Sequence, residues 1–363
     1  MQTPEHPYKS LPKSAFWRTA IAEKHYADFS DLSEPLIVAS GAKIATAGSC
    51  FAQHIGRALR SRSFQYLDCE PAPHGLTPEE AHRHGFGVFS CRYGNIYTVA
   101  QLLQLMKEAF GQIRPMDPVW TRDGRYYDSQ RISVDLVGHD SAEDVLALRE
   151  QHLSCVRDMF INLDIFVFTL GLTEAWRFKQ DGSVFPNCPG TGPGQFDPNL
   201  YSFHNYNYPE IASEFVTFRE RLKWVNPRAR ILLTVSPVPL TATASGKHVL
   251  PATVYSKSTL RAVAGDMADK YDDVSYFPSY EIIASHPMRG IFFNPDGRTV
   301  NATGVELVMK HFFAALQAGD STSHDVRKAE VDAPQASVSP DTESNQDDKL
   351  GLICDEEKLD AFS

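Results

Sequence analysis

One short segment of the sequence places two potential nucleophiles directly after a strand. Lys43–Ala47 is predicted to be a short strand of small residues, and it leads into Gly48, Ser49 and Cys50 before the amphipathic helix predicted at Phe51–Arg60. The start of a helix offers free N–H groups and the positive end of the helix dipole, which stabilise thiolates and oxyanions. The segment therefore indicates a nucleophile for acyl transfer. The alternative is that Ser49 caps the helix and Cys50 is a small buried side chain.

The elements that position this turn alternate between strands and helices. Three further apolar runs are typical of buried strands: Ile165–Leu170, Ile231–Val235 and Val274–Phe277. Helices are predicted between and after them, at Val99–Phe110, from the Ser141 capping box to about Phe160, at Pro209–Val225, at Ser256–Tyr271, and at Thr303–Leu316 with Thr303 and Glu306 as a capping box. This alternation predicts an α/β fold, a parallel sheet with helices on both faces.

Ligands of such folds bind beyond the carboxyl ends of the strands. Four polar segments fall at these ends, namely Gly48–Cys50, Gly171–Glu174, Ser236–Pro239 and Ser279–Glu281. We therefore expect one edge of the sheet to carry the active site. The Gly, Pro and aromatic-rich loop 179–208 lies near it in sequence order, and its aromatic rings suit sugar substrates, although loop packing explains them equally well.

The rest of the chain divides into three parts. Residues 1–40 are polar and Pro-punctuated, which predicts an N-terminal arm, and 41–318 form the main domain, with long loops at 61–98 and 179–208. Residues 319–363 are poor in apolar side chains and predict an acidic disordered tail. From Asp320 to Ser363 the chain carries 12 acidic and 4 basic side chains, so most of the formal net charge of −10 lies in the tail.

Charge and cysteine usage exclude several classes of function. A nearly neutral body has no basic face for tracking phosphates, so no nucleic acid is expected as a partner. The six cysteines are scattered without a C-x-x-C pair, which predicts free thiols and no metal site. No G-x-G-x-x-G follows the first strand, and no cofactor is expected. With neither a signal peptide nor a membrane-spanning apolar run, the predicted location is cytoplasmic, and protein partners stay undefined.

The motifs of the main domain resemble those of the GSCFA-domain family, which is grouped with the SGNH (GDSL-like) hydrolases. The resemblance spans roughly residues 40–315 and is carried by Thr46–Ile55 (TAGSCFAQHI), Phe89–Tyr97 (FSCRYGNIY), Thr169–Trp176 (TLGLTEAW), Ser236–Leu240 (SPVPL), Ser256–Ser258 (SKS) and Phe277–Ile282 (FPSYEI). It implies a flavodoxin-like three-layer α/β/α domain and an acyl hydrolase site.

The SGNH motifs imply roles for individual residues. The nucleophile motif lies over Gly48-Ser49-Cys50 and selects Cys50 when the glycines are aligned or Ser49 when the serines are. The other residues implied for the oxyanion hole and substrate binding are Gly87, or Gly94 with Asn95, and then Gly171, Thr173 in place of an Asn, and Glu174.

The catalytic histidine is the point of departure from the SGNH pattern. The position of Asp-x-x-His reads Asp296-Gly297-Arg298-Thr299, so the Asp is present and the His is replaced by Thr299. His286, shortly after the fourth strand, is the first choice for the base. His54, His204 and His248 are the alternatives.

Together these observations predict an esterase or O-acyltransferase acting on a carbohydrate or another small acylated substrate. The alternative is an SGNH-fold binding or scaffold protein, for example a glycan-binding one, that has lost catalysis together with the histidine.

Overall fold

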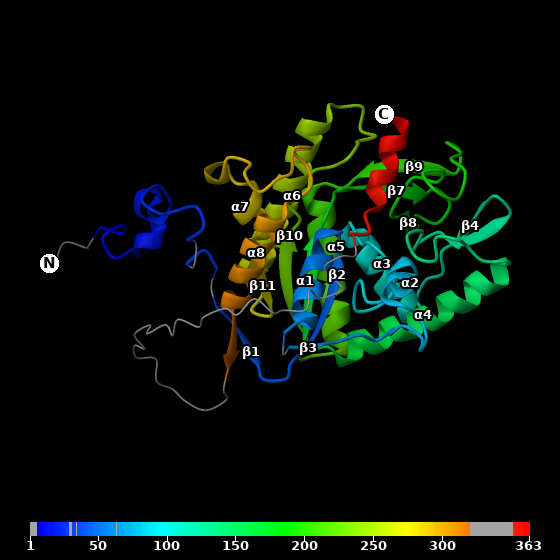
Figure 1. Ribbon diagram of the computed structural model, residues 1–363, viewed down its shortest axis with the longest axis horizontal. Helices are drawn as coiled ribbons and strands as arrows, with labels where there is room; N and C mark the ends of the chain where they lie inside the picture. Colours follow the sequence, from blue (N-terminus) through cyan, green and yellow to red (C-terminus); the bar gives the residue numbers. More distant parts are fainter. Residues whose placement is uncertain (1–5, 29–30, 34, 63, 320–350) are drawn as a thin grey trace.

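A five-stranded parallel sheet forms the centre of the protein (Figure 1). The computed structural model describes residues 6–28, 31–33, 35–62, 64–319 and 351–363. The strand order is β11-β10-β6-β2-β3, made of β2 (Lys43–Gly48), β3 (Gln65–Tyr66), β6 (Ile165–Leu170), β10 (Arg230–Val235) and β11 (Val274–Phe277). The four strands predicted from apolar runs are confirmed, and β3 is an addition inside the predicted loop 61–98.

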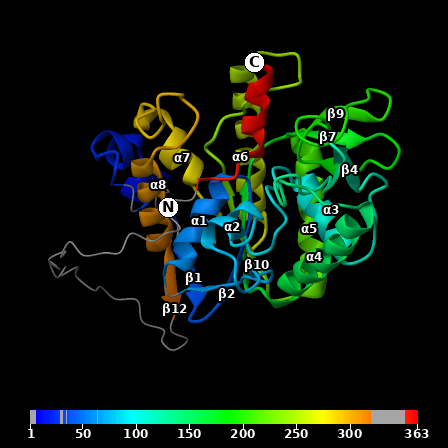
Figure 2. The ribbon, with the colours of Figure 1, turned by 45° about the vertical axis from the view of Figure 1, so that its right-hand side comes forward.

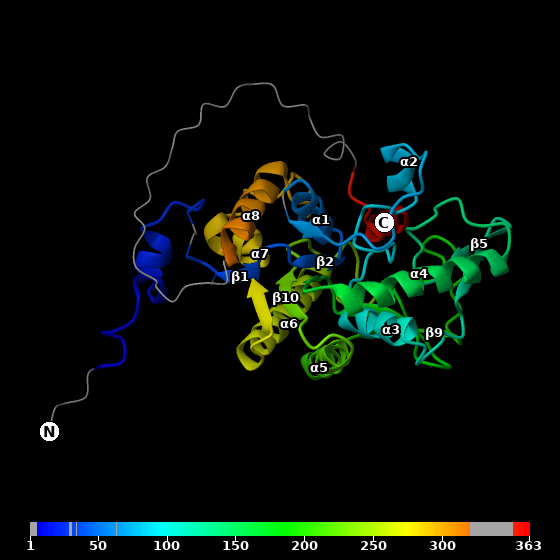
Figure 3. The ribbon, with the colours of Figure 1, turned by 90° about the horizontal axis from the view of Figure 1, so that it is seen from below.

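Alternating side chains of the strands divide the core into two halves. Ile44 and Val167 pack on the side of α1 (Phe51–Arg60), α7 (Ser279–Ala284) and α8 (Ala302–Ala315). Phe166 and Phe168 pack on the opposite side. That side is covered by α3 (Val99–Ala109), α4 (Ala142–Asn162), α5 (Tyr208–Val225) and α6 (Val249–Lys270). Figure 3 shows the sheet between these two helix layers, which confirms the three-layer α/β/α fold.

Two helix starts differ from the sequence prediction. The start of α8 is capped by Asn301, whose side chain accepts a hydrogen bond from Gly304 N, so the predicted Thr303 capping box is wrong. The start of α6 lies seven residues earlier than expected, because the His248 ring accepts from Leu250 N and caps the helix there. At α4 the predicted Ser141 cap is present, with Ser141 Oγ accepting from Asp144 N.

The connections place the switch point of the sheet at the end of β2. The chain leaves β2 through α1 on one face to reach β3, and it enters β6, on the other side of β2, after α3 and α4 on the opposite face. The direction of winding therefore changes between β2 and β6. In open α/β sheets this switch point is where ligands bind. The segment Gly48-Ser49-Cys50 emerges there.

The predicted loop 179–208 contributes two strands to a small antiparallel sheet. Strand β7 (Glu174–Phe178) pairs with β8 (Val184–Phe185) and β9 (Tyr201–Asn205). The rings of Phe178, Phe185 and Tyr201 pack with Trp120 of β4 (Val119–Arg122), which pairs with β5 (Arg125–Asp128). These aromatic rings are buried in a satellite core, so packing accounts for them.

The two ends of the chain both lie against the domain. The N-terminal segment includes the helical turns η1 (Lys13–Ala15) and η2 (Arg18–Ala22) and the strand β1 (Leu36–Ala39), which pairs with β12 (Leu316–Gly319). Most of the predicted disordered tail, residues 320–350, lies outside the described residues. Its last part differs from that prediction, because the 3₁₀ helix η5 (Asp355–Phe362) folds onto the body.

Figures 1 and 2 show this C-terminal segment, in red, beside the upper ends of α1 and β2. Within the described ranges, no helix combines the length and hydropathy needed to cross a membrane.

Candidate active site

The turn between β2 and α1 is pinned by close backbone contacts. Gly48 has φ +142°, and a Cβ there would lie 2.5 Å from the Thr169 carbonyl oxygen of β6. Ser49 N donates to that same oxygen at 3.3 Å, and Ile96 N donates to the Gly48 carbonyl at 2.9 Å. Only glycine combines this φ with this approach. The predicted role of Gly48 is thus positional: it fixes the direction in which Ser49 and Cys50 leave the sheet.

Ser49 and Cys50 are both buried at the start of α1. Their exposed fractions are 3% and 4%. Cys50 already has helical backbone angles and stands at the N-cap position, while Ser49 Oγ has no hydrogen-bond partner among the described residues. Ser49 therefore does not cap α1, and the alternative prediction that this serine is a helix cap is wrong. A buried hydroxyl without a partner costs about 1 to 3 kcal/mol, so the Ser49 hydroxyl is available to a ligand or a reacting group.

The second wall of the site comes from the end of β6 and from α6. A Cβ on Gly171 would lie 3.0 Å from Ser49 Cβ, so the two segments touch. Lys257 of α6 is fully buried and its Nζ donates to the Gly171 carbonyl oxygen at 2.7 Å. Burial lowers the pKa of Lys257 to about 8, and the neighbouring Glu356 and Cys50 partly oppose that shift. The site thus holds an amine that can exchange a proton near neutral pH.

The predicted oxyanion donor Gly171 is already engaged. Its N–H donates to the Tyr97 carbonyl oxygen at 3.0 Å, and Leu172 N donates to the same oxygen. Asn95 Nδ2 is also engaged, but by the C-terminal residues Ile353, at its carbonyl oxygen, and Asp355, at its carboxylate, both at 2.9 Å, so departure of these residues would free it as a donor. Among the backbone N–H groups that open α1, those of Ala52 and Gln53 donate to the carbonyl oxygens of Ser49 and Cys50, at 2.9 and 3.1 Å.

The C-terminal segment closes the site from above. Cys354 Sγ lies 3.5 Å from Cys50 Sγ, and all six cysteines of the chain are free thiols. The neighbouring Cys354 and burial raise the pKa of Cys50 well above its ordinary value. Negative charge nearby and a low-dielectric environment both disfavour the charged form of the Cys50 thiol. With the segment in this position, Cys50 is a protonated thiol at neutral pH.

Arg298 lies at the same edge of the central sheet, on the loop that contains Asp296. Its guanidinium contacts the Glu356 carboxylate at 3.3 Å and donates through Nε to the Pro239 carbonyl oxygen at 3.2 Å. Asp296 is exposed, and its carboxylate accepts from the N–H groups of Arg298 and Thr299 and from Thr299 Oγ1. These bonds lower the pKa of Asp296. Asp296 therefore shapes the loop that presents Arg298, and no histidine is bonded to it in the described part of the chain.

The structure does not bring the predicted histidines to the nucleophile. His286 is exposed and stacks on Trp17, with ring centroids 5.1 Å apart. His204 on β9 hydrogen-bonds Glu210, and His248 caps α6. His54 lies one turn along α1 edge-on to Phe51, and burial lowers its pKa to about 4. Among the described residues no histidine hydrogen-bonds Ser49 or Cys50.

The remaining predicted residues divide between the site and its surroundings. Gly94 has φ +68° and turns the chain so that Asn95 reaches the site, whereas Gly87 lies beside Arg60 at the other end of α1. Thr173 is fully buried with its Oγ1 unpartnered, and its N–H donates to Ser256 Oγ. Glu174 accepts from Thr243 Oγ1, and burial raises its pKa.

Sequence reasoning missed Lys257, Arg298 and the C-terminal segment. A signal for Lys257 was present, because it shares a helix face with Leu260, Ala264 and Met267, all of which are buried. A lysine on the apolar stripe of a helix indicates a functional or paired charge. For the C-terminal segment no such signal exists, since its contacts with the body depend on the tertiary fold.

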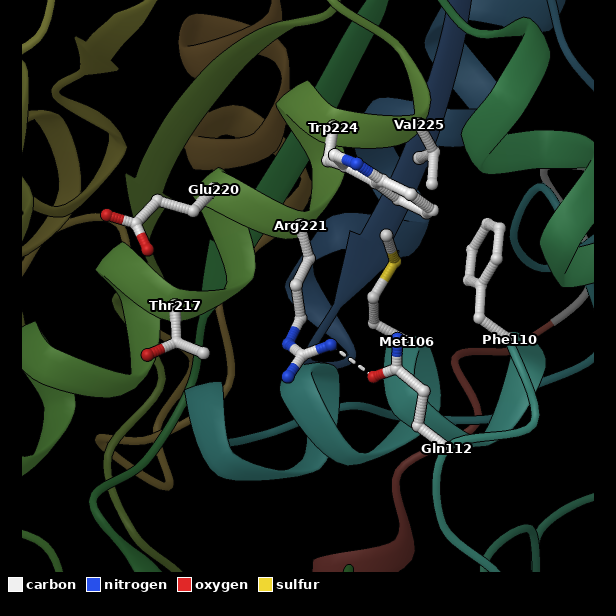
Figure 4. A pocket seen from close by; sticks show the side chains of 8 residues that line it. All are labelled: Met106, Phe110, Gln112, Thr217, Glu220, Arg221, Trp224 and Val225. Carbon is white, nitrogen blue, oxygen red and sulfur yellow. Dashed lines mark hydrogen bonds between the residues drawn. The ribbon is translucent and has the colours of Figure 1, made fainter.

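A cavity of about 380 Å³ lies between α3 and α5 (Figure 4). Met106 and Trp224 face each other across it, and Arg221 donates to Gln112 at its rim. It lies near the C-terminal end of α5, which leads into the amino end of β10, so it opens at the edge of the sheet opposite Cys50.

Within the described ranges no group of three or more His, Cys, Asp or Glu side chains is arranged to hold a metal ion.

The sequence comparison identifies the family. The model of the GSCFA family matches residues 43–312, which is most of the chain. The chain belongs to the GSCFA family. The matched range runs from the first strand of the central sheet to α8 and so includes the Gly48–Cys50 turn, Lys257 and Arg298, while the C-terminal segment lies outside it. No curated protein matches the sequence.

Among solved structures the GSCFA chain is similar to several esterases. A family 3 carbohydrate esterase from Clostridium thermocellum aligns at 11% identity and a TM-score of 0.33, covering 75% of this chain and 93% of that one. A family 3 carbohydrate esterase from Talaromyces cellulolyticus aligns at 12% identity and a TM-score of 0.30, covering 75% and 94%. An acetyl esterase mutant with an acetate ion aligns at 11% identity and a TM-score of 0.30, covering 74% and 93%.

Proposed function

We propose that this GSCFA protein is an acyl-transfer enzyme, an esterase or O-acyltransferase, with Cys50 as its nucleophile. The observation that carries the proposal is the placement of Cys50 at the start of α1, at the switch point of the sheet, beside the fully buried Lys257. A thiol at a helix N-terminus near a lysine is the arrangement that activates cysteines. Ser49, buried with an unpartnered hydroxyl, is the alternative nucleophile.

In the proposed reaction Lys257 replaces the missing histidine as the proton carrier. Once the C-terminal segment has left Cys50, the neutral amine takes the proton of Cys50, and the thiolate attacks the carbonyl carbon of an ester to form a tetrahedral oxyanion. Asn95 Nδ2, freed from the segment, and the N–H groups of Cys50 and Phe51 are the proposed donors for that oxyanion. The C–O bond then breaks, Lys257 returns the proton to the leaving alcohol, and a thioester remains. Water or an acceptor hydroxyl cleaves the thioester and regenerates Cys50.

The substrate class that we propose is a small acylated molecule such as an acylated carbohydrate. Support comes from the polar edge of the sheet at the switch point and from the β7-β8-β9 sheet, whose first residue, Glu174, is separated from the end of β6 only by Gly171, Leu172 and Thr173. Cytoplasmic location stays a prediction from the sequence.

The test uses the purified full chain with nitrophenyl acetate, nitrophenyl butyrate and acetylated xylose. Cys50→Ala is expected to lower kcat at least about 1000-fold, Ser49→Ala less than about tenfold, and the control Cys155→Ala not at all, because Cys155 lies on α4, away from the site. Mass spectrometry of Cys50 during turnover is expected to show a thioester. Full activity of Cys50→Ala with an inactive Ser49→Ala would move the nucleophile to Ser49, and full activity of both would refute the proposal.

A second candidate, a binding protein without catalysis, is favoured by one observation. No histidine of the described part of the chain reaches Ser49 or Cys50, and the chain's own C-terminal segment fills the site. Saturable binding of an acylated glycan with no turnover of any ester, and no thioester on Cys50, would support this candidate over the enzyme.

A further inference from the structure

The C-terminal segment is held over Cys50 as a bound peptide is held. Gln53 of α1 accepts from Ile353 N at 3.0 Å and donates to the Ile353 carbonyl oxygen at 2.7 Å. Asn95 Nδ2 donates to the same oxygen and, at 2.9 Å, to the Asp355 carboxylate. Both polar groups of the Ile353 backbone are thus satisfied by side chains of the body. This recognition fixes the register in which Cys354 and Glu356 enter the site.

The main domain supplies the positive charges beside Cys50, and the C-terminal segment supplies the negative charge. The Arg298 and Glu356 side chains are only 16% and 9% exposed, and they form an ion pair at 3.3 Å. In the described part of the chain, Glu356 is the acid with which Arg298 forms an ion pair. Lys257 is fully buried behind them, and Glu356 is the acid whose charge acts most strongly on it. Without the segment, the buried Lys257 and the part-buried Arg298 would both lose the Glu356 carboxylate.

Unpaired buried charge is expensive, so an arrangement of this kind requires an anion. Arg298 also has the fixed geometry that recognises carboxylates, since its loop is held by the Asp296 bonds and its Nε by Pro239. The Glu356 carboxylate therefore marks the position that an anionic group of a substrate would occupy. Other acids face the same space: Asp355 is held by Asn95, and Glu174 acts on Glu356 through its charge.

We propose that Arg298, with Lys257 behind it, forms a carboxylate-binding subsite beside Cys50, and that the substrate is an ester that carries a carboxylate, for which Glu356 of the chain's own C-terminal segment is the resident competitor. This inference rests on the proposed acyl-transfer function and adds the substrate's charge to it. It follows that loss of the Glu356 carboxylate opens the subsite to carboxylate ligands, whereas loss of Arg298 removes the subsite.

The first arm of the experiment measures turnover by full-length variants on matched esters, neutral nitrophenyl acetate and anionic mono-nitrophenyl succinate. Glu356→Gln is expected to raise kcat/KM for the anionic ester at least tenfold relative to the neutral one. Adding Arg298→Gln is expected to reverse that preference, mainly through KM. The matched controls Glu357→Gln and Arg289→Gln remove exposed charges nearby and are expected to leave both values as in the wild type.

The second arm measures binding of free succinate by calorimetry and does not depend on turnover. Glu356→Gln is expected to bind succinate, and Glu356→Gln with Arg298→Gln to bind at least tenfold more weakly. If no variant cleaves either ester but this binding pattern is observed, the carboxylate subsite is supported and the acyl-transfer function is refuted. If Glu356→Gln neither binds succinate nor prefers the anionic ester, the subsite is refuted. Circular dichroism of each variant verifies that it is folded.

Discussion

Two clusters of buried polar side chains in this protein are built on opposite principles. The charge cluster, between α3, α4 and β5, consists of Glu108, Asp128, Arg131 and Arg149. Arg149 donates to both oxygens of Asp128, at 2.8 and 3.0 Å, and to Glu108, while Arg131 Nε donates to Asp128 at 2.8 Å. The carboxylates and guanidinium groups there pair with one another.

The strand-end cluster, at the switch point of the sheet, consists of Ser49, Cys50, Thr173, Lys257 and Arg298. It contains two buried hydroxyls without a partner, and Arg298 pairs with an acid that arrives from the far end of the chain. Satisfied buried groups hold a fold together, whereas groups left unsatisfied are retained for what they bind. Burial is common to the two clusters, and what distinguishes them is whether the polar groups pair within the cluster.

The largest difference between the two clusters is expected when one cation of each cluster is replaced by methionine. Arg149→Met leaves Asp128 and Glu108 with unpaired buried charge and is expected to lower the free energy of unfolding by about 3 to 5 kcal/mol. Lys257→Met is expected to change it by less than about 1 kcal/mol, yet to abolish ester turnover. Urea unfolding of the folded variants measures both. Equal loss of stability in the two would show that the strand-end cluster is structural.

A pH series tests His152, a buried neighbour of the charge cluster whose Nδ1 donates to Glu70 Oε2 at 2.7 Å. Burial lowers the pKa of His152 to about 4, below the ordinary 6.5 of an unfolded chain. Because the unfolded chain binds the proton more readily, stability is complete above pH 6.5 and is lost as the pH falls towards 4, by about 1 to 3 kcal/mol. Urea midpoints at pH 7 and 4.5 measure this loss of stability. His152→Asn is expected to reduce the loss, and the exposed control His74→Gln is expected to leave it unchanged.

Hydroxyl and amide deletions give a smaller contrast. Gln104 bonds both the N–H and the carbonyl of Val184, so Gln104→Met strands two buried backbone groups and is expected to cost about 2 kcal/mol. Thr173→Val deletes a hydroxyl that has no partner and is expected to be neutral or stabilising, while lowering catalysis if the hydroxyl serves the reaction. Thermal unfolding of each variant checks the difference, and a destabilised Thr173→Val would mean that its hydroxyl is satisfied in solution.

The pH dependence of turnover tests Lys257 directly. With its pKa lowered to about 8, loss of a proton in that region creates the amine that accepts from Cys50, so kcat/KM is expected to rise up to tenfold from pH 7 to 9. Glu356 raises the pKa of Lys257, and Cys50 and Arg298 are the other charges facing it. Glu356→Gln is therefore expected to move the rise to lower pH. A profile that does not move would argue against Lys257 as the proton carrier.

The smallest expected effect is that of His286→Ala. The ring stacks on Trp17 at the surface, so its removal is expected to change kcat/KM less than twofold. It is also expected to lower the free energy of unfolding by at most about 0.5 kcal/mol. A hundredfold loss of activity in a folded His286→Ala protein would restore the histidine as the base and displace Lys257.

Patterns within single elements were predicted well from the sequence, and contacts between elements were not. The run Ile165–Leu170 and the spacing of Phe51–Arg60 match β6 and α1 residue for residue, because both depend on local periodicity. The choice of histidine was a contact between elements. His286 lies close to the end of β11 in sequence, but the 3₁₀ turn η3 (His286–Met288) leaves its ring exposed at the surface.

What the sequence by itself determined is the family, the order of strands and helices, and the turn that carries Ser49 and Cys50, since these follow from residue types at fixed spacing. The tertiary structure alone decided what surrounds that turn. Lys257, Arg298 and Glu356 come from three distant parts of the chain, and their charges act on one another only because the fold removes the water between them. A sequence records the charges of these residues, but their interaction depends on distance and dielectric, and both are set by packing.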